Sequence, residues 1–196
     1  QLGGGFTRYS TDTYWKVPHF EKMLYDNGQL ISLYAQAFQY TQTPLYLQVI
    51  NQTVEWLERE MKHPLGCYFS ALDADSEGIE GKYYVWQKEE LEHLLKDDFE
   101  IFADYYCVND IGYWEDENYV LMRNAEDSVI ALKHNISVTE LQQKIKTCAA
   151  ILLQVREKRV KPGLDNKVLA SWNGLMCKAL TEAYLVFEEE KFKNLA

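Results

Sequence analysis

The sequence has few of the features that mark membrane or nucleic-acid-binding proteins. No apolar run is long enough to span a bilayer, and no secretory hydrophobic segment is present. The chain has only 20 basic residues against 30 acidic ones, a net charge of -10. Such a charge repels phosphate backbones, and no basic cluster offsets it. We therefore expect a soluble, cytoplasmic protein whose main partner is neither nucleic acid nor a membrane.

Metal and cofactor motifs are also missing. The cysteines form no C-x-x-C pair and have no histidine at metal-ligand spacing, which favours idle or buried thiols in a reducing compartment. The stretch from Asp73 to Gly78 begins like a calcium loop, but Tyr84 stands where such a loop needs a glutamate. No phosphate-binding loop, dinucleotide fingerprint or serine nucleophile elbow occurs. We expect no cofactor and no metal. The cysteines are Cys67, Cys107, Cys148 and Cys177.

With 47% hydrophobic residues in 196, the chain can bury a sizeable core and forms one large domain or part of a larger one. It begins with Gln1 rather than methionine, which is compatible with the loss of an N-terminal targeting segment. It stops at Ala196, just after a helix for which we expect a partner helix. We interpret it as a fragment in which residues 1–196 are part of one helical domain.

Hydrophobic periodicity predicts an all-α fold. Apolar residues recur at steps of three and four, and Pro44 stands at a favourable first helical position. Between the second and third helices, strand-prone runs at 67–70 and 82–86 flank an acidic, glycine-containing loop, which predicts a small β-hairpin insertion. Residues 112–122 are expected to be irregular or extended. The expected helices cover residues 18–40, 44–61, 87–95, 99–107, 137–160 and the stretch from 172 onward.

A weak similarity between three short segments of the chain suggests an internal repeat. Gly3–Phe6, Gly66–Phe69 and Gly112–Trp114 each place glycine before aromatic residues outside the helices. Repeated helical hairpins with such loops are typical of an α/α toroid or solenoid.

Three polar segments are the candidates for a functional site: segment 1 (His19–Asp26), segment 2 (Ser70–Glu77) and segment 3 (Leu164–Gly174). Each combines charged or amide side chains with aromatic neighbours, the mixture expected where a polar ligand is held in a cleft. Together they predict one site assembled from three places in the chain.

In segment 1, helical spacing places His19, Lys22 and Asp26 on one strip at the edge of the apolar face. A histidine there could act as general acid or base, with Asp26 orienting it. The alternative is an exposed Lys22–Asp26 ion pair beside a histidine at the helix start.

Segment 2 carries Asp73 and Asp75, which face the same side of an extended chain because alternate residues do so. A carboxylate pair serves glycoside hydrolysis, but ordinary turn chemistry explains the same residues. In segment 3, Asp165, Trp172 and Asn173 lie in a loop and helix start, where ligand contacts are common. There the alternatives are helix capping by the aspartate and burial of the tryptophan in the core.

Long stretches of the chain resemble the YyaL-like family, also called the spermatogenesis-associated thioredoxin-domain family. The matching stretches are Gly4–Ser10, Trp15–Asn27, Ser70–Glu77, Glu80–Trp86 and Ser171–Leu175. The resemblance implies an (α/α)6 toroid related to N-acylglucosamine 2-epimerases and six-hairpin glycosidases, incomplete in this chain. It also implies an N-terminal thioredoxin-like domain, absent here, as an intramolecular partner. The family pattern in segment 3 usually reads Asp-Asp-Lys, whereas this chain has Asn166 as the second residue; if the second acid were catalytic, its loss would weaken activity.

We therefore expect a carbohydrate-active domain, either a glycoside hydrolase or a sugar epimerase, with a small sugar as its partner. The acid/base candidates are His19, Asp26, Asp73, Asp75 and Asp165. Arg8, Trp15, Lys22, Trp86, Trp172 and Asn173 are the expected substrate contacts. The alternatives are a non-catalytic binding or scaffolding module for the thioredoxin-like domain and a structural fragment without a ligand site. A module without catalysis predicts that the acids of the three segments are buried and mutually paired.

Overall fold

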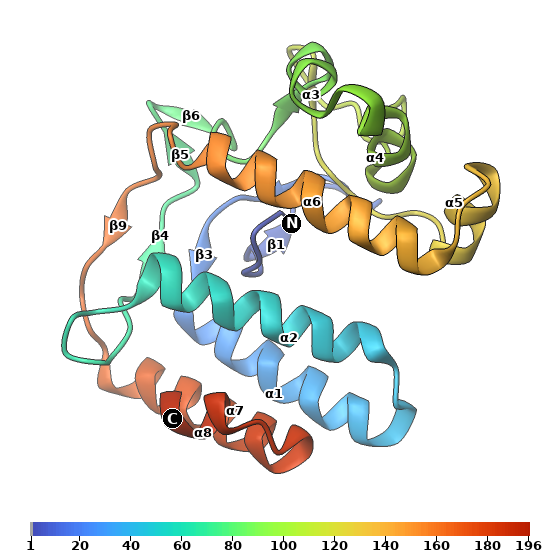
Figure 1. Ribbon diagram of the computed structural model, residues 1–196. Helices are drawn as coiled ribbons and strands as arrows, with labels where there is room; N and C mark the ends of the chain where they lie inside the picture. Colours follow the sequence, from blue (N-terminus) through green and yellow to red (C-terminus); the bar gives the residue numbers. More distant parts are fainter. Residues whose placement is uncertain (1) are drawn as a thin grey trace. The chain divides into compact units, whose positions relative to one another are not determined.

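The computed structural model, which describes residues 2–196, is mostly helical with small sheets (Figure 1). The chain forms two compact units, and neither is continuous in sequence. Unit 1 comprises Leu2, Ser10–Pro18 and Ser76–Lys161, whereas unit 2 comprises Gly3–Tyr9, His19–Asp75 and Pro162–Ala196. The predicted all-α class is thus confirmed in part: the fold is mostly helical, but it also contains small sheets that join segments distant in sequence.

The helices of unit 2 are α1 (Leu24–Thr41), α2 (Pro44–Trp56), α7 (Ala170–Phe187) and α8 (Glu190–Leu195), with a π-helical turn at Leu57–Met61 after α2. Those of unit 1 are α3 (Lys88–Leu95), α4 (Phe99–Tyr106), α5 (Asp127–Lys133) and α6 (Val138–Arg156), with a 3-10 turn at Lys96–Asp98. The strands are β1 (Tyr9–Ser10), β2 (Pro18–His19), β3 (Lys22–Met23), β4 (Ala71–Leu72), β5 (Asp75–Ser76), β6 (Ile79–Glu80), β7 (Trp86–Gln87), β8 (Asn118–Tyr119) and β9 (Leu164–Asp165). They pair as β1-β2, β3-β4-β9, β5-β6 and β7-β8.

The helical predictions are largely confirmed. Pro44 begins α2 after a left-handed Gln42 ends α1, which produces the expected α1–α2 hairpin. Ser137 caps α6 by accepting a hydrogen bond of 3.1 Å from the Glu140 amide. The predicted start of the first helix at residue 18 was wrong, because Lys22 and Met23 pair with β4 and α1 begins only at Leu24. Helix α5 was not anticipated, and α6 ends at Arg156 rather than near residue 160.

The β-hairpin insertion exists, but between other residues than those predicted. The tight hairpin joins β5 to β6, and Glu77 and Gly78 at its tip both have positive φ, at 54° and 75°. Two positive φ values are the signature of a type I′ turn. The two expected strands do not pair with each other: β4 lies between β3 and β9, and β7 pairs with β8.

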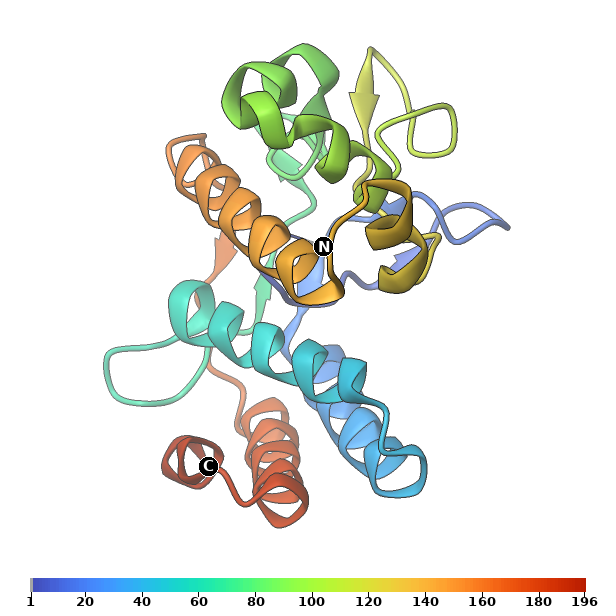
Figure 2. The same ribbon diagram turned by 45° about the vertical axis from the view of Figure 1, so that its right-hand side comes forward.

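The central sheet of unit 2 fixes the direction of two helices. Because β3 and β9 both run antiparallel to β4, they run parallel to each other. Strand β3 leads directly into α1, and β9 leads through a short loop into α7, so the two helices start at the same edge of the sheet (Figure 1). Gly28 permits their close approach, since a Cβ there would lie 3.3 Å from the backbone nitrogen of Met176. Figure 2 shows the same pair of helices from another side.

Each unit has its own hydrophobic core. In unit 2 the apolar faces of α1, α2 and α7 meet around residues such as Leu24, Ile31 and Leu180, all inaccessible to solvent. In unit 1 the core lies among α3, α4 and α6, with Trp86 and Leu141 at 0% exposure. Residues 2–196 contain no helix that is both long and apolar enough to cross a membrane.

The cysteines form no disulfide within the described chain. Cys107 and Cys148 are buried, and burial raises the pKa of Cys148 to about 11, so that thiol is neutral and unreactive at neutral pH. Cys67 is half-buried and Cys177 is exposed, which only partly matches the expectation of buried thiols.

Candidate functional site

The three polar segments meet at the central sheet of unit 2. The Leu24 amide of segment 1 donates to the Ser70 carbonyl at 2.9 Å, and the Ser70 amide donates to the Asp165 carbonyl at 3.2 Å. The Ser70 hydroxyl also donates to the Asp165 carbonyl at 3.0 Å. The three segments therefore adjoin one another in the sheet, and their joint role as one ligand site stays a prediction.

A group of charged and aromatic side chains lies where the chain enters α1. This group, the Arg8 cluster, consists of Arg8, His19, Glu21, Tyr25 and Asp26. The Arg8 guanidinium lies 3.3 Å from the Glu21 carboxylate, and the His19 imidazole lies 3.6 Å from the same carboxylate oxygen. Interaction with Tyr25 and with Glu21 raises the pKa of Arg8, so its positive charge is held firmly. The cluster thus joins a fixed cation, a carboxylate and an imidazole.

Asp26 is the acid of this cluster whose environment is unusual. Its Oδ2 is buried and has no hydrogen-bond partner among residues 2–196. Burial raises the pKa of Asp26, the Arg8 charge opposes the rise, and the Glu21 charge adds to it. A half-buried carboxyl group with a raised pKa can hold and release a proton nearer to neutral pH, which is the property needed in a general acid.

Aromatic rings flank the cluster. The Tyr9 ring stacks on His19 with a centroid distance of 4.9 Å. On the other side, Tyr25 at the start of α1 meets Trp172 at the start of α7 edge-on, at 4.8 Å. Trp172 is half-buried, and its expected role in stacking on a sugar stays a prediction.

The sequence analysis included Arg8, His19 and Asp26 but missed Glu21 and Tyr25. It assigned Glu21 to the solvated side of a helix, because it continued the helix back to Pro18. In extended chain, residues two apart face the same side, so His19 and Glu21 belong together. A strand assignment for residues 18–23 would have paired them.

Three of the expected substrate contacts have structural roles instead. Lys22 is 0% exposed, and its ammonium donates to the Gly4 carbonyl at 2.7 Å and lies 5.4 Å from the Trp56 ring centroid. The helical strip of His19, Lys22 and Asp26 is therefore wrong, and so is its alternative of an exposed ion pair. Lys22 is oriented by strand pairing into the interior.

Asn173 and Trp86 are likewise committed to the fold. The Asn173 amide accepts from the Tyr68 amide at 2.8 Å and donates to the Tyr68 carbonyl at 3.0 Å, which ties α7 to the chain before β4. Trp86 is 0% exposed in the core of unit 1, where the Arg159 guanidinium covers its ring at 4.0 Å. Trp86 therefore offers no free surface to a sugar, whereas a ligand contact of the half-buried Asn173 stays a prediction.

The remaining acids and Trp15 lie outside the Arg8 cluster. Asp73 and Asp75 are exposed on either side of the buried Ala74, which confirms that they face the same way. Asp165 pairs with Lys167 at 2.7 Å, and that partner lowers the pKa of Asp165. Trp15 belongs to unit 1 and is 82% exposed. Catalytic or binding roles for these residues stay predictions.

The described residues contain no group of three or more histidine, cysteine or acidic side chains placed to hold a metal ion. The chemistry that the Arg8 cluster can perform with its own groups is proton transfer, together with recognition of hydroxyl or carboxylate oxygens by Arg8.

No protein-family model matches the chain. An uncharacterized protein of Caenorhabditis elegans is 36% identical to it and is matched over 100% of this chain and 30% of its own length. Spermatogenesis-associated protein 20 of Mus musculus is 36% identical over 96% of this chain and 27% of its own length, and the Homo sapiens protein is 32% identical over 100% and 28%. The chain thus spans less than a third of these relatives.

Two solved structures were also matched. A D-mannose isomerase gives a TM-score of 0.37 with 16% identity, over 100% of this chain and 44% of that chain. A family 76 glycoside hydrolase from a bovine Bacteroides thetaiotaomicron strain gives a TM-score of 0.32 with 12% identity, over 90% and 33%. The chain is a homologue of one part of spermatogenesis-associated protein 20.

Proposed function

We propose that this chain is part of an (α/α)6 toroid domain of the YyaL-like family that acts on a sugar by acid/base catalysis. The arrangement of unit 2 supports the toroid: α1 and α7 run parallel and side by side, and each is followed by a partner helix. In a toroid of helical hairpins, the inner helices run parallel and their ends line the central cleft. Segments 1 and 3 lie at the starts of α1 and α7, and segment 2 joins them through β4 of the central sheet.

The observation that carries the proposal is the state of Asp26. A carboxyl group with a buried, unpartnered oxygen and a raised pKa lies beside Arg8 and the Glu21–His19 pair. We assign to Asp26 the role of general acid and to His19, oriented by Glu21, the role of general base. Arg8 would bind a substrate oxygen, and Trp172 would contact the sugar ring.

A histidine together with an acid favours an epimerase or isomerase over a hydrolase. Such a reaction removes a proton from the carbon beside the sugar carbonyl and returns one to the same or the neighbouring carbon. Glycoside hydrolysis instead needs two carboxyl groups about 5 to 10 Å apart across the bond. Asp73, Asp75 and Asp165 are the candidates for a second carboxyl group in that alternative.

The second candidate function is a binding or scaffolding module that serves a thioredoxin-like domain in the cytoplasm. It is favoured by the structural use of Lys22 and Asn173, whose polar groups bond to the protein backbone. Against it stands Asp26, because a module without chemistry has no use for a desolvated, unpartnered acid.

Solvent deuterium incorporation tests the proposal. The full-length protein is incubated in D₂O with a panel of aldoses and ketoses, and exchange at the carbon beside the carbonyl is followed by NMR. We expect exchange with at least one sugar, and a loss of about 10²- to 10⁴-fold in its rate in Asp26→Asn. Asp97→Asn, an exposed acid in unit 1, is the matched control and should be unaffected. Absence of both exchange and hydrolysis across the panel would leave the scaffold as the better account.

A further inference from the structure

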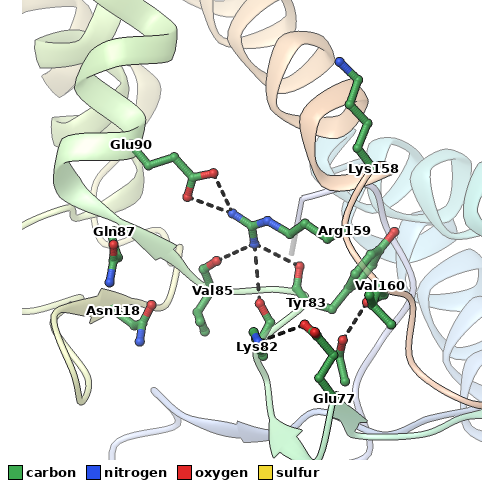
Figure 3. Close-up of a pocket in the computed structure, with 11 residues that line it drawn as sticks. Glu77, Lys82, Tyr83, Val85, Gln87, Glu90, Asn118, Lys158, Arg159 and Val160 are labelled. Carbon is green, nitrogen blue, oxygen red and sulfur yellow. Dashed lines mark hydrogen bonds and ion pairs between the residues drawn. The ribbon is translucent and has the colours of Figure 1, made fainter.

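A pocket in unit 1 has no part in the function proposed above. It has a volume of about 430 Å³, within the range of small-molecule sites, and lies among the β5–β6 hairpin, the β7–β8 ladder, the start of α3 and the end of α6 (Figure 3). None of the residues of the Arg8 cluster lines it. Its lining mixes polar and apolar residues, and four of its five charged side chains form ion pairs.

The centre of the pocket is rigid. Arg159 forms a two-pronged ion pair with the Glu90 carboxylate at 2.8 and 3.0 Å. The same guanidinium donates to the backbone carbonyls of Val85 at 2.8 Å and Tyr83 at 3.2 Å, and its Cζ lies 4.0 Å from the Trp86 ring centroid. A side chain held by so many contacts presents the neighbouring carboxylate in a fixed position, as ligand binding requires.

Four of the five charged side chains that line the pocket are paired, and the fifth, Lys158, is an exposed cation. Glu90 is paired with Arg159, and at the other end Glu77 is paired with Lys82 at 2.8 Å. In Figure 3 the Lys158 side chain extends away from the Arg159 group. Because solvent screens the exposed Lys158, a charged ligand would gain little net Coulomb attraction here and would still lose its hydration.

Two amide side chains provide the uncommitted hydrogen-bonding groups. Gln87 and Asn118 stand directly opposite each other in the β7–β8 ladder and lie side by side in Figure 3. The Asn118 amide nitrogen donates to the carbonyls of Glu115 and Asp116, which leaves its oxygen as an acceptor. The Gln87 amide makes no hydrogen bond within residues 2–196, so both its donor and its acceptor are available. Cross-strand neighbours of this kind present their groups on one face.

We propose that this pocket binds a neutral polyhydroxylated molecule of monosaccharide size. Hydroxyl groups both donate and accept, so one ligand can donate to Glu90 and to the Asn118 oxygen and exchange hydrogen bonds with the Gln87 amide. Neutrality follows from the pairing of four of the five lining charges and the exposure of the fifth, Lys158. The inference is independent of the Arg8 cluster, which belongs to unit 2.

NMR titration of the 196-residue chain tests the inference. D-glucose, D-mannose and myo-inositol are the neutral probes, and D-glucuronate is the charged one. We expect shifts in the side-chain amide signals of Gln87 and Asn118 with at least one neutral probe, and weaker binding of glucuronate. No shift at these signals with any neutral probe, or tighter and salt-dependent binding of glucuronate, would overturn the proposal.

Gln87→Leu removes the free amide from an exposed position, and we expect a loss of about tenfold or more in affinity, the effect of one good hydrogen bond. Gln154→Leu, the same change at an exposed site on α6 away from the pocket, is the control and should bind normally. Unchanged affinity in Gln87→Leu contradicts the proposal. Asp26→Asn should abolish sugar chemistry and leave pocket binding intact, so the two proposals fail separately.

Discussion

The Asn173 amide is expected to stabilise unit 2, and its removal gives a direct measure of that role. In Asn173→Ala three hydrogen bonds are lost: two with the backbone of Tyr68, at 2.8 and 3.0 Å, and one with the Leu169 carbonyl at 3.1 Å. Neutral hydrogen bonds each contribute about 0.5 to 1.5 kcal/mol net. Tyr68 is only 4% exposed, so its freed amide and carbonyl have poor access to water. We expect a decrease of about 2 to 4 kcal/mol in the free energy of unfolding.

Urea unfolding followed by tryptophan fluorescence measures this change, since Trp56 and Trp172 both report on unit 2. With a slope of about 2 kcal/mol per molar urea, the unfolding midpoint should fall by about 1 to 2 M. The matched control is Asn166→Ala, an exposed asparagine that precedes α7, for which we expect a change within about 0.5 kcal/mol.

Equal midpoints for Asn173→Ala and Asn166→Ala would refute the structural role of Asn173. In that case its amide would be free to contact a ligand, as the sequence alone suggested. Asn173→Asp sharpens the comparison, because it keeps the acceptor for the Tyr68 amide but loses both donated bonds. Its stability should lie between those of the native chain and Asn173→Ala in acid, where the aspartate is neutral.

Three further perturbations test other features. Because the folded-state pKa of Asp26 is raised, the native chain loses stability as pH rises from the ordinary carboxyl range through that pKa. Urea unfolding at pH 4 and pH 7 should therefore show Asp26→Asn gaining stability relative to the native chain at the higher pH. Gly4→Ala should prevent folding or lower the free energy of unfolding by more than about 3 kcal/mol, because φ is +78° there and the new Cβ would lie 1.9 Å from the Gln52 carbonyl oxygen. Gly66→Ala is the control: φ is +91°, but the new Cβ meets no atom, so the loss should be only about 1 kcal/mol. Thermal unfolding measures both variants. Burial acts to raise the pKa of Asp104, but its interactions with Lys133 and His134 outweigh burial and lower the pKa. The stability that Asp104 contributes should therefore be present at neutral pH and lost as pH falls below about 4, and Asp104→Asn should flatten this acid limb in pH-dependent unfolding.

The long helices could be predicted from the sequence because their apolar stripes repeat over several turns. The start of α1 could not. Phe20, Lys22 and Leu24 are each at most 1% exposed, a period-2 pattern typical of a strand, but a lysine at the middle position conceals it. Strands of two residues also carry no periodicity of their own, and their pairing is decided by tertiary contacts.

The dependence of short strands on tertiary contacts also explains which site residues the sequence predicted and which it missed. Composition alone identified the three segments, and the sheet does bring them together. Which side chains face outward depends on whether residues 19–23 form a helix or extended chain. A helix would place Lys22 beside His19 and Asp26, whereas the extended chain buries Lys22 and places Glu21 beside His19. Asn173 was expected at the ligand because an amide at a helix start is typical of both capping and binding, and only the position of Tyr68 distinguishes them.

The central sheet also has a consequence for biosynthesis. Strand β4 receives its second neighbour, β9, from a position 95 residues later, as the Ser70–Asp165 bond shows. At about 5 to 20 residues per second, a ribosome leaves that edge of β4 unpaired for about 5 to 20 seconds. During this interval most of unit 1 emerges, so it can fold while unit 2 still waits for its last helices. An unpaired strand edge is a template for wrong pairing, and the nascent chain is therefore most exposed to aggregation and most dependent on chaperones just before residue 164 is made.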